Sequence, residues 1–203
     1  MSNYIPQLSA YSPDNVYTSN YYQAQGSTYY DMPNCTRYAY GRWWALLGSE
    51  PTYMRNLGNG EDWFNNAPAN IQRGSNPKLG AIACFLDGPY SGLGHVAVVE
   101  RIMSDGKVLF SNSAYRGSMY YIRCGTQANN YHDGGLGYPG YEVQYIFQGF
   151  LYCPEDFDPE IDPGPVPPPG PDPGGYGANP LLRYMAKKQI YRNQGRLGTD
   201  VYT

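Results

Sequence analysis

The pattern of apolar positions divides the chain into a helical part followed by a part made of strands. Between residues 35 and 47 apolar and aromatic side chains recur at helical spacing, and Gly48 follows as a stop. This spacing predicts a helix over 35–47. A second helix is expected near 61–71, where acidic residues open the segment and Pro68 limits its length.

Short apolar runs rich in β-branched residues follow, separated by turns that contain Gly, Asn and Asp. The turn at 104–107 joins two of these runs as a hairpin. Because helices come first and hairpin-connected strands follow, we expect an α+β fold, with N-terminal helices packed on an antiparallel sheet of about five to six strands. The predicted strands cover residues 81–86, 95–102, 108–113, 119–123 and 142–152.

Composition divides the chain into four segments. Residues 1–32 are rich in Tyr, Ser, Asn and Gln and are expected to form an extended arm laid partly on the folded domain, which covers 33–153. The Pro- and Gly-rich residues 154–178 predict an extended polyproline spacer. Residues 179–203 contain a short basic amphipathic stretch, which is expected to dock on the domain or a partner, or to begin a further module.

Charge and hydropathy exclude several classes of function. The formal net charge is −3 and the isoelectric point is about 5.3, which argues against a nucleic-acid partner. No apolar run approaches the roughly 18 residues of a membrane-spanning helix. The N-terminus lacks the basic and apolar regions of a secretory signal. We therefore expect a protein without a membrane partner and without an export signal of its own.

The cysteines do not have the spacing of a metal site. None of the four belongs to a Cys-x-x-Cys pair, so a structural zinc ion is not expected, and there is no acidic calcium loop. We expect no metal and no other cofactor. Cys84 lies in an apolar run and is interpreted as a buried core residue. A disulfide among Cys84, Cys124 and Cys153 is left open.

Cys35 is the candidate nucleophile. It follows Asn34, a preferred N-cap residue, at the predicted start of the first helix. The positive end of the helix dipole is expected to favour thiolate over thiol there. His95 begins a strand directly after a Gly-rich turn, where a base can face a nucleophile from another element. His132, the second histidine, is interpreted as a solvated loop residue.

Asn112, on the next strand, is the candidate partner that orients the His95 imidazole. An amide oxygen can accept the imidazole N–H as a carboxylate does. Glu100 is a poor alternative because it lies five residues along the same strand as His95, on the opposite face. Structural roles compete with each assignment: a core thiol for Cys35, a strand cap for His95, and a strand-end residue for Asn112.

Several ordered motifs resemble those of CHAP domains, the cysteine- and histidine-dependent amidohydrolases and peptidases of phage lysins and bacterial cell-wall hydrolases. The resemblance covers roughly residues 30–153. It departs from the family at Asn112, where many members carry an acidic residue, at Ala114, where many carry Asn, and at Ala81, where many carry Asp. The matching segments are 34–42, 62–67, 77–83, 94–100 and 112–117.

The resemblance implies a papain-like fold and catalysis by Cys35, His95 and Asn112. It implies a substrate groove shaped by the loop that contains Tyr115 and by Trp43 and Trp44, although core packing is the competing role of the tryptophans.

The implied function is hydrolysis of an amide bond in bacterial peptidoglycan, as an N-acetylmuramoyl-L-alanine amidase or an endopeptidase. The absence of an export signal is typical of a phage product, either a lysin released from the host cytoplasm during lysis or a hydrolase of the virion tail. The spacer would then lead to a wall-binding module or a tail component. The alternative is a catalytically impaired phage structural or wall-binding protein with the same fold.

Overall fold

The computed structural model describes residues 2–8, 15–22, 34–87, 93–113, 120–132 and 145–158, all within one compact unit, Met1–Asp162. The predicted C-terminal segment 179–203 and most of the predicted spacer lie outside the described residues. Within the described ranges, no helix has the length and apolar character that crossing a membrane requires.

The long helix α2 spans Cys35–Leu47, as predicted. At its start the side chain of Asn34 accepts a hydrogen bond from the backbone N–H of Arg37 at 3.1 Å, which satisfies one of the free donors of the first turn. At its end Gly48 takes a left-handed conformation, with φ 65°. Local capping signals at both ends therefore explain why the prediction matched the bounds.

The second predicted helix is much shorter than expected. A 3₁₀ turn, η3 (Gly60–Asp62), leads into α3, which ends at Asn66 (Trp63–Asn66). Ala67 has φ −54° and ψ 139°, the extended conformation that a following proline imposes. Pro68 therefore ends the helix at Asn66. A further 3₁₀ turn, η2 (Thr52–Met54), precedes this region.

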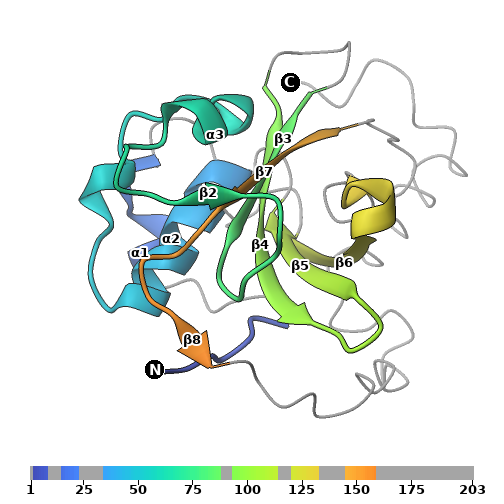
Figure 1. Cartoon of the computed structure of the whole chain (residues 1–203). Helices are drawn as coiled ribbons and strands as arrows, with labels where there is room; N and C mark the ends of the chain where they lie inside the picture. The colour runs from blue at the N-terminus through green and yellow to red at the C-terminus, as the bar shows by residue number, and fades with distance from the viewer. Residues whose placement is uncertain are drawn as a thin grey trace, which may run out of the picture. The chain divides into compact units, whose positions relative to one another are not determined.

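Six antiparallel strands form the sheet, in the order β2-β7-β3-β4-β5-β6, with α1, α2 and α3 gathered beside it (Figure 1). The α+β prediction is confirmed, and each predicted strand has a counterpart. The two-residue strand β2 was not predicted, because so short a run shows no alternation. The bounds are β2 (Arg73–Gly74), β3 (Ile82–Leu86), β4 (His95–Ile102), β5 (Lys107–Ser113), β6 (Tyr120–Thr126) and β7 (Ile146–Leu151).

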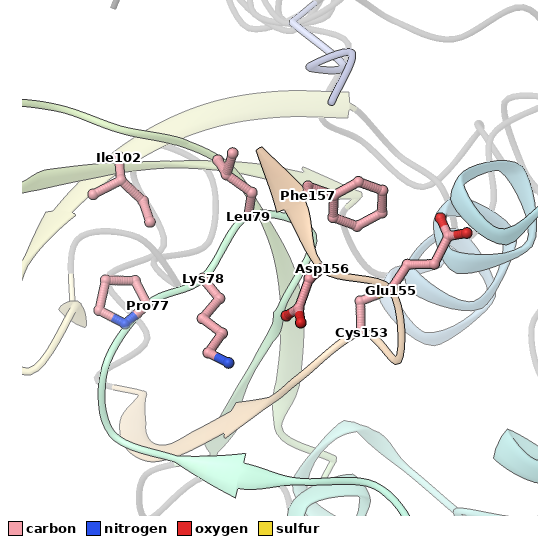
Figure 2. A pocket seen from close by; sticks show the side chains of 8 residues that line it. All are labelled: Pro77, Lys78, Leu79, Ile102, Cys153, Glu155, Asp156 and Phe157. Carbon is pink, nitrogen blue, oxygen red and sulfur yellow. The ribbon is translucent and has the colours of Figure 1, made fainter. Parts of the chain in front are cut away.

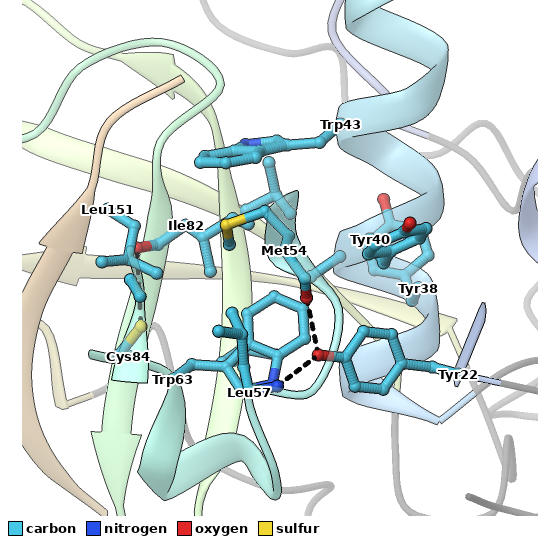
Figure 3. Close-up of a cluster of buried hydrophobic side chains, with 14 of the residues drawn as sticks. Tyr22, Tyr38, Tyr40, Trp43, Met54, Leu57, Trp63, Ile82, Cys84 and Leu151 are labelled. Atoms are coloured by element: carbon cyan, nitrogen blue, oxygen red, sulfur yellow. Dashed lines mark hydrogen bonds between the residues drawn. The ribbon is translucent and has the colours of Figure 1, made fainter. Parts of the chain in front are cut away.

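The main core lies between α2 and one face of the sheet (Figure 3). The large aromatic rings fill this core, and their polar atoms make hydrogen bonds within it. The Tyr22 hydroxyl donates to the Met54 carbonyl at 2.8 Å and accepts from the Leu57 N–H at 3.2 Å. Trp43, which is fully buried, donates its indole N–H to the Gly80 carbonyl at 2.7 Å. Buried Tyr and Trp require such partners, so these bonds fix the helix against the loops around it.

The N-terminal segment is part of this core. Helix α1 (Asn15–Thr18) contains Tyr17, whose buried ring stacks on a tyrosine of α2, and Tyr22 is completely buried. The first residues form β1 (Ser2–Asn3), which pairs in parallel with β8 (Phe157–Asp158). The described parts of the expected arm are therefore integrated into the domain, and β8 falls where the spacer was expected to begin.

A buried ion pair connects this segment to the sheet. Glu100 is fully buried, and its carboxylate accepts from the Arg42 guanidinium at 2.9 Å and from the Ser111 hydroxyl at 2.6 Å. The Tyr4 hydroxyl and the Gln7 backbone N–H, both from the N-terminal segment, donate to the same carboxylate at 2.8 Å. Glu100 is thus committed to a structural network and is not a partner of His95.

Candidate active site

Cys35 opens α2, half-buried, with its sulfur against the start of β4, where the Val96 backbone N–H donates a hydrogen bond to it. The backbone N–H groups of Thr36 and of Cys35 itself also favour the thiolate. Burial outweighs these donors and raises the pKa of the Cys35 thiol above its ordinary value of 9.0. The predicted helix-terminus effect is present, but its expected outcome, a lowered thiol pKa, is wrong for this protein without substrate.

His95 is the first residue of β4 and only 3% exposed. Its Nε2 lies 2.9 Å from Oδ1 of Asn112, a fully buried residue of β5. The Asn112 amide nitrogen donates to the Phe110 carbonyl at 3.2 Å, which orients the amide oxygen toward His95. Because an amide oxygen only accepts, Nε2 carries the proton of the neutral ring. Nδ1 is then the basic nitrogen, which is the tautomer that a general base requires.

The surroundings of His95 keep its ring neutral. Burial lowers the pKa of His95 to about 4, and the smaller opposing effects are the hydrogen bond to Asn112 and the negative charge of Asp87. The Tyr145 ring stacks on the imidazole, with centroids 5.2 Å apart and planes 15° from parallel. The Tyr121 hydroxyl lies 3.5 Å from Nε2. Cys35 and His95 therefore rest as a neutral thiol and a neutral imidazole.

Two glycines allow η3 to pack against the backbone of the base. A Cβ on Gly60 would lie 2.8 Å from the His95 backbone nitrogen, and one on Gly94 would lie 2.4 Å from the Glu61 nitrogen. The Glu61 N–H donates to the Leu93 carbonyl at 3.2 Å across this contact. The Gly-rich turn before β4 was visible in the sequence, but no local signal linked Gly60 to His95.

The other predicted site residues do not gather around this pair. Trp43 is completely buried in the core, so the prediction that its ring contacts substrate is wrong in this conformation. Trp44 is half-buried against the same core. Tyr115 lies outside the described residues. Tyr145, which sequence reasoning did not single out, lies within a predicted strand segment and carries no motif that marks it.

Two pockets differ in their position relative to the candidate catalytic residues. One of about 450 Å³ adjoins the site, because Tyr145 and His132 are among its lining residues. The other, of about 350 Å³, lies beside β8 and includes Lys78, Asp156 and Phe157, but none of the candidate catalytic residues (Figure 2).

In the part of the chain that the structure describes, the cysteines and acidic residues are not clustered as metal ligands. Among the described residues, no group of three His, Cys, Asp or Glu side chains could hold a metal ion. All four cysteines lie in the described ranges and are free thiols in this structure.

Residues 24–114 match the family model of the CHAP domain, a range that includes Cys35, His95 and Asn112. A protein of Streptococcus mutans is 38% identical over 93 residues, which is 44% of this chain and 40% of that protein. The staphylococcal secretory antigen SsaA of Staphylococcus aureus is 34% identical over 113 residues, 55% of this chain and 40% of the antigen. This chain therefore covers less than half of these relatives.

A crystal structure of an N-acetylmuramoyl-L-alanine amidase from Staphylococcus aureus has 30% sequence identity to this chain and a TM-score of 0.39. The similarity covers 47% of this chain and 28% of the amidase chain.

Proposed function

We propose that this chain is a peptidoglycan hydrolase that cleaves an amide bond with Cys35 as nucleophile, since residues 24–114 match the family model of the CHAP domain. The observation that carries the proposal is the arrangement of three buried or half-buried groups at the junction of α2 and β4. Cys35 lies against the Val96 N–H, one residue after His95, and Asn112 holds the imidazole in the tautomer of a base. A structural thiol would need no such partner.

In the proposed reaction, substrate binding brings a carbonyl carbon to the Cys35 sulfur. The thiol proton moves to Nδ1 of His95 as the sulfur adds to this carbon and forms a tetrahedral intermediate. The backbone N–H of Cys35, one of the free donors at the start of α2, stabilises the oxyanion. The resulting imidazolium then gives its proton to the amine nitrogen as the C–N bond breaks, which leaves a thioester on Cys35. Water, deprotonated by His95, hydrolyses the thioester and restores the thiol.

Substitution of the nucleophile tests this proposal. Cys35→Ser should abolish clearing of Gram-positive cell walls in a turbidity assay, while Cys124→Ser, a change at an exposed free thiol of β6, should leave it intact. If wild type and Cys35→Ser clear walls at the same rate, catalysis by Cys35 is refuted. Mass spectrometry of the digest distinguishes the two bond types: a new N-terminal Ala indicates an amidase, and new stem or cross-bridge ends indicate an endopeptidase.

One observation favours a second candidate, a wall-binding or structural protein without catalysis. Asn112 stands where many CHAP domains carry an acidic residue, and an amide stabilises the imidazolium less than a carboxylate does. This candidate predicts that wild-type protein sediments with purified walls and releases no fragments from them. The proposed hydrolase releases fragments, and Cys35→Ser retains only the binding.

We also propose that residues 154–178 tether this domain to a wall-binding module or a phage tail component, and that the protein acts as a phage lysin or virion hydrolase. The composition of the segment supports the tether, since Pro-rich chains are extended and cannot form a core.

A further inference from the structure

The pocket of about 450 Å³ shares Tyr145 with the candidate active site. The ring that stacks on His95 at 5.2 Å also lines this pocket, so a ligand there would lie one side chain from the base. The helical turn η5 (Gln127–Asn129), drawn in yellow after β6 in Figure 1, contributes Asn129 to the lining. The lining residues are Asn129, Asn130, His132, Tyr145, Ile146 and Phe147.

The lining is polar and aromatic. It offers the carboxamides of Asn129 and Asn130 beside the rings of Tyr145 and Phe147, and no Asp, Glu, Lys or Arg belongs to it. A peptide stem carries carboxylates and ammonium groups, whose binding in a pocket requires counter-charges. A sugar that carries hydroxyl and acetamide groups on an apolar ring requires amide partners and aromatic surface instead.

The turn that presents Asn130 is held in an uncommon conformation. Asn130 and Tyr131 are consecutive non-glycine residues in the left-handed region, with φ 52° and 55°. Asn tolerates this region, whereas for Tyr it is costly and persists only where surrounding contacts impose it. The buried Tyr131 ring meets Phe147 at 5.0 Å and Phe150 at 5.1 Å, which anchors the turn. Asn130 is consequently displayed, exposed, on a fixed backbone.

We propose that this pocket is a substrate subsite that takes an N-acetylhexosamine unit of the glycan strand. The assignment rests on the proposed function, because it identifies the part of peptidoglycan that lies beside the reacting carbonyl. A sugar bound against Tyr145 places the bond between glycan and stem peptide next to Cys35. The subsite therefore assigns the enzyme to the amidase class.

Binding of a chitin trimer, a chain of three N-acetylglucosamine units, tests the subsite directly. The titration uses the full chain with Cys35→Ala and follows the trimer by NMR. Adding Asn130→Gly removes the carboxamide while glycine keeps the left-handed turn, so the fold is retained. Loss of one hydrogen bond should weaken binding about 5-fold. The matched control is Asn56→Gly, at a left-handed asparagine (φ 62°) that does not line the pocket, and it should bind like the parent.

Absence of trimer binding, or equal binding by Asn130→Gly and the parent, overturns the proposal. If a free stem peptide binds in the pocket and the trimer does not, the pocket is a peptide subsite, and the proposal of a sugar ligand is overturned. In the hydrolysis assay Asn130→Gly should raise KM and leave kcat unchanged. The trimer titration does not require turnover, so trimer binding by a protein that fails to hydrolyse walls would refute the proposed enzyme and retain the subsite.

Discussion

Acid should destabilise this protein through His95. Burial lowers the pKa of His95 from 6.5 to about 4, so between these values the unfolded chain binds a proton that the folded chain excludes. The associated stability is complete above pH 6.5 and is lost as the pH falls toward 4. The shift corresponds to roughly 3 kcal/mol, a large fraction of the about 5–15 kcal/mol that stabilises a typical domain.

The ionisable groups around His95 explain the direction of this effect. Asp87, directly after β3, opposes the shift, as does the hydrogen bond from Asn112 of β5. Tyr145, directly before β7, stacks on the ring, and burial raises the pKa of its hydroxyl, so it supplies no charge. The Tyr121 hydroxyl of β6 lies 3.5 Å from Nε2. One carboxylate does not compensate for complete burial of an imidazolium.

His95→Gln isolates the contribution of this residue. The glutamine amide keeps a donor that can reach Asn112 but binds no proton. Urea unfolding at pH 7.5, 5.5 and 4.5 should show that wild type loses roughly 2–3 kcal/mol more than His95→Gln over this interval. His132→Gln changes the only other histidine, which is half-buried and lines the proposed subsite, and is the matched control for the loss of one imidazole.

Equal losses in wild type and His95→Gln would refute a neutral, buried His95 as the source of the acid sensitivity. If His132→Gln removed the acid sensitivity and His95→Gln did not, His132 would be its source and the assignment to His95 would be wrong.

Three further substitutions test the supports of the site. Asn112→Ala removes the acceptor of the buried Nε2–H, so kcat should fall by roughly 10-fold or more with little change in KM, measured by steady-state kinetics. Gly60→Ala places a Cβ 2.8 Å from the His95 backbone nitrogen, so both the melting temperature and kcat should fall. Wild-type values of both would show that η3 can move away from His95 without loss of stability or activity. Glu100→Gln leaves the Arg42 guanidinium buried without its counter-charge, and urea unfolding should show a loss of about 3–5 kcal/mol.

Elements with local signals at their ends were predictable from the sequence. Helix α2 is bounded by the Asn34 cap and Gly48, and β4 begins after a Gly-rich turn, so both matched their predicted ranges. The helix near residue 61 was overestimated, because Pro68 imposes an extended conformation on Ala67 and the helix already ends at Asn66. Strands β1, β2 and β8 have two residues each and exist only through pairing with distant segments, which no local pattern records.

The contact between His95 and Asn112 was predictable from the sequence, and the electrostatics of the candidate site were less so. The β4–β5 hairpin register brings Asn112 to His95 across 17 residues of sequence, as the strand pattern implied. The roles of Tyr145 and Gly60 depend on packing between elements far apart in the chain, and neither residue carries a motif. The direction of the Cys35 pKa was wrong because the sequence shows the helix terminus but not the depth of burial.

The neutral resting pair and the asparagine at position 112 are consistent with each other. An amide oxygen accepts the Nε2 proton of a neutral ring without stabilising a positive charge, so it orients His95 and leaves burial to determine the charge state. A carboxylate in its place would favour the imidazolium and with it a permanent thiolate at Cys35. In the proposed reaction, proton transfer from Cys35 is therefore coupled to the arrival of substrate, whose developing oxyanion supplies the negative charge that the imidazolium needs.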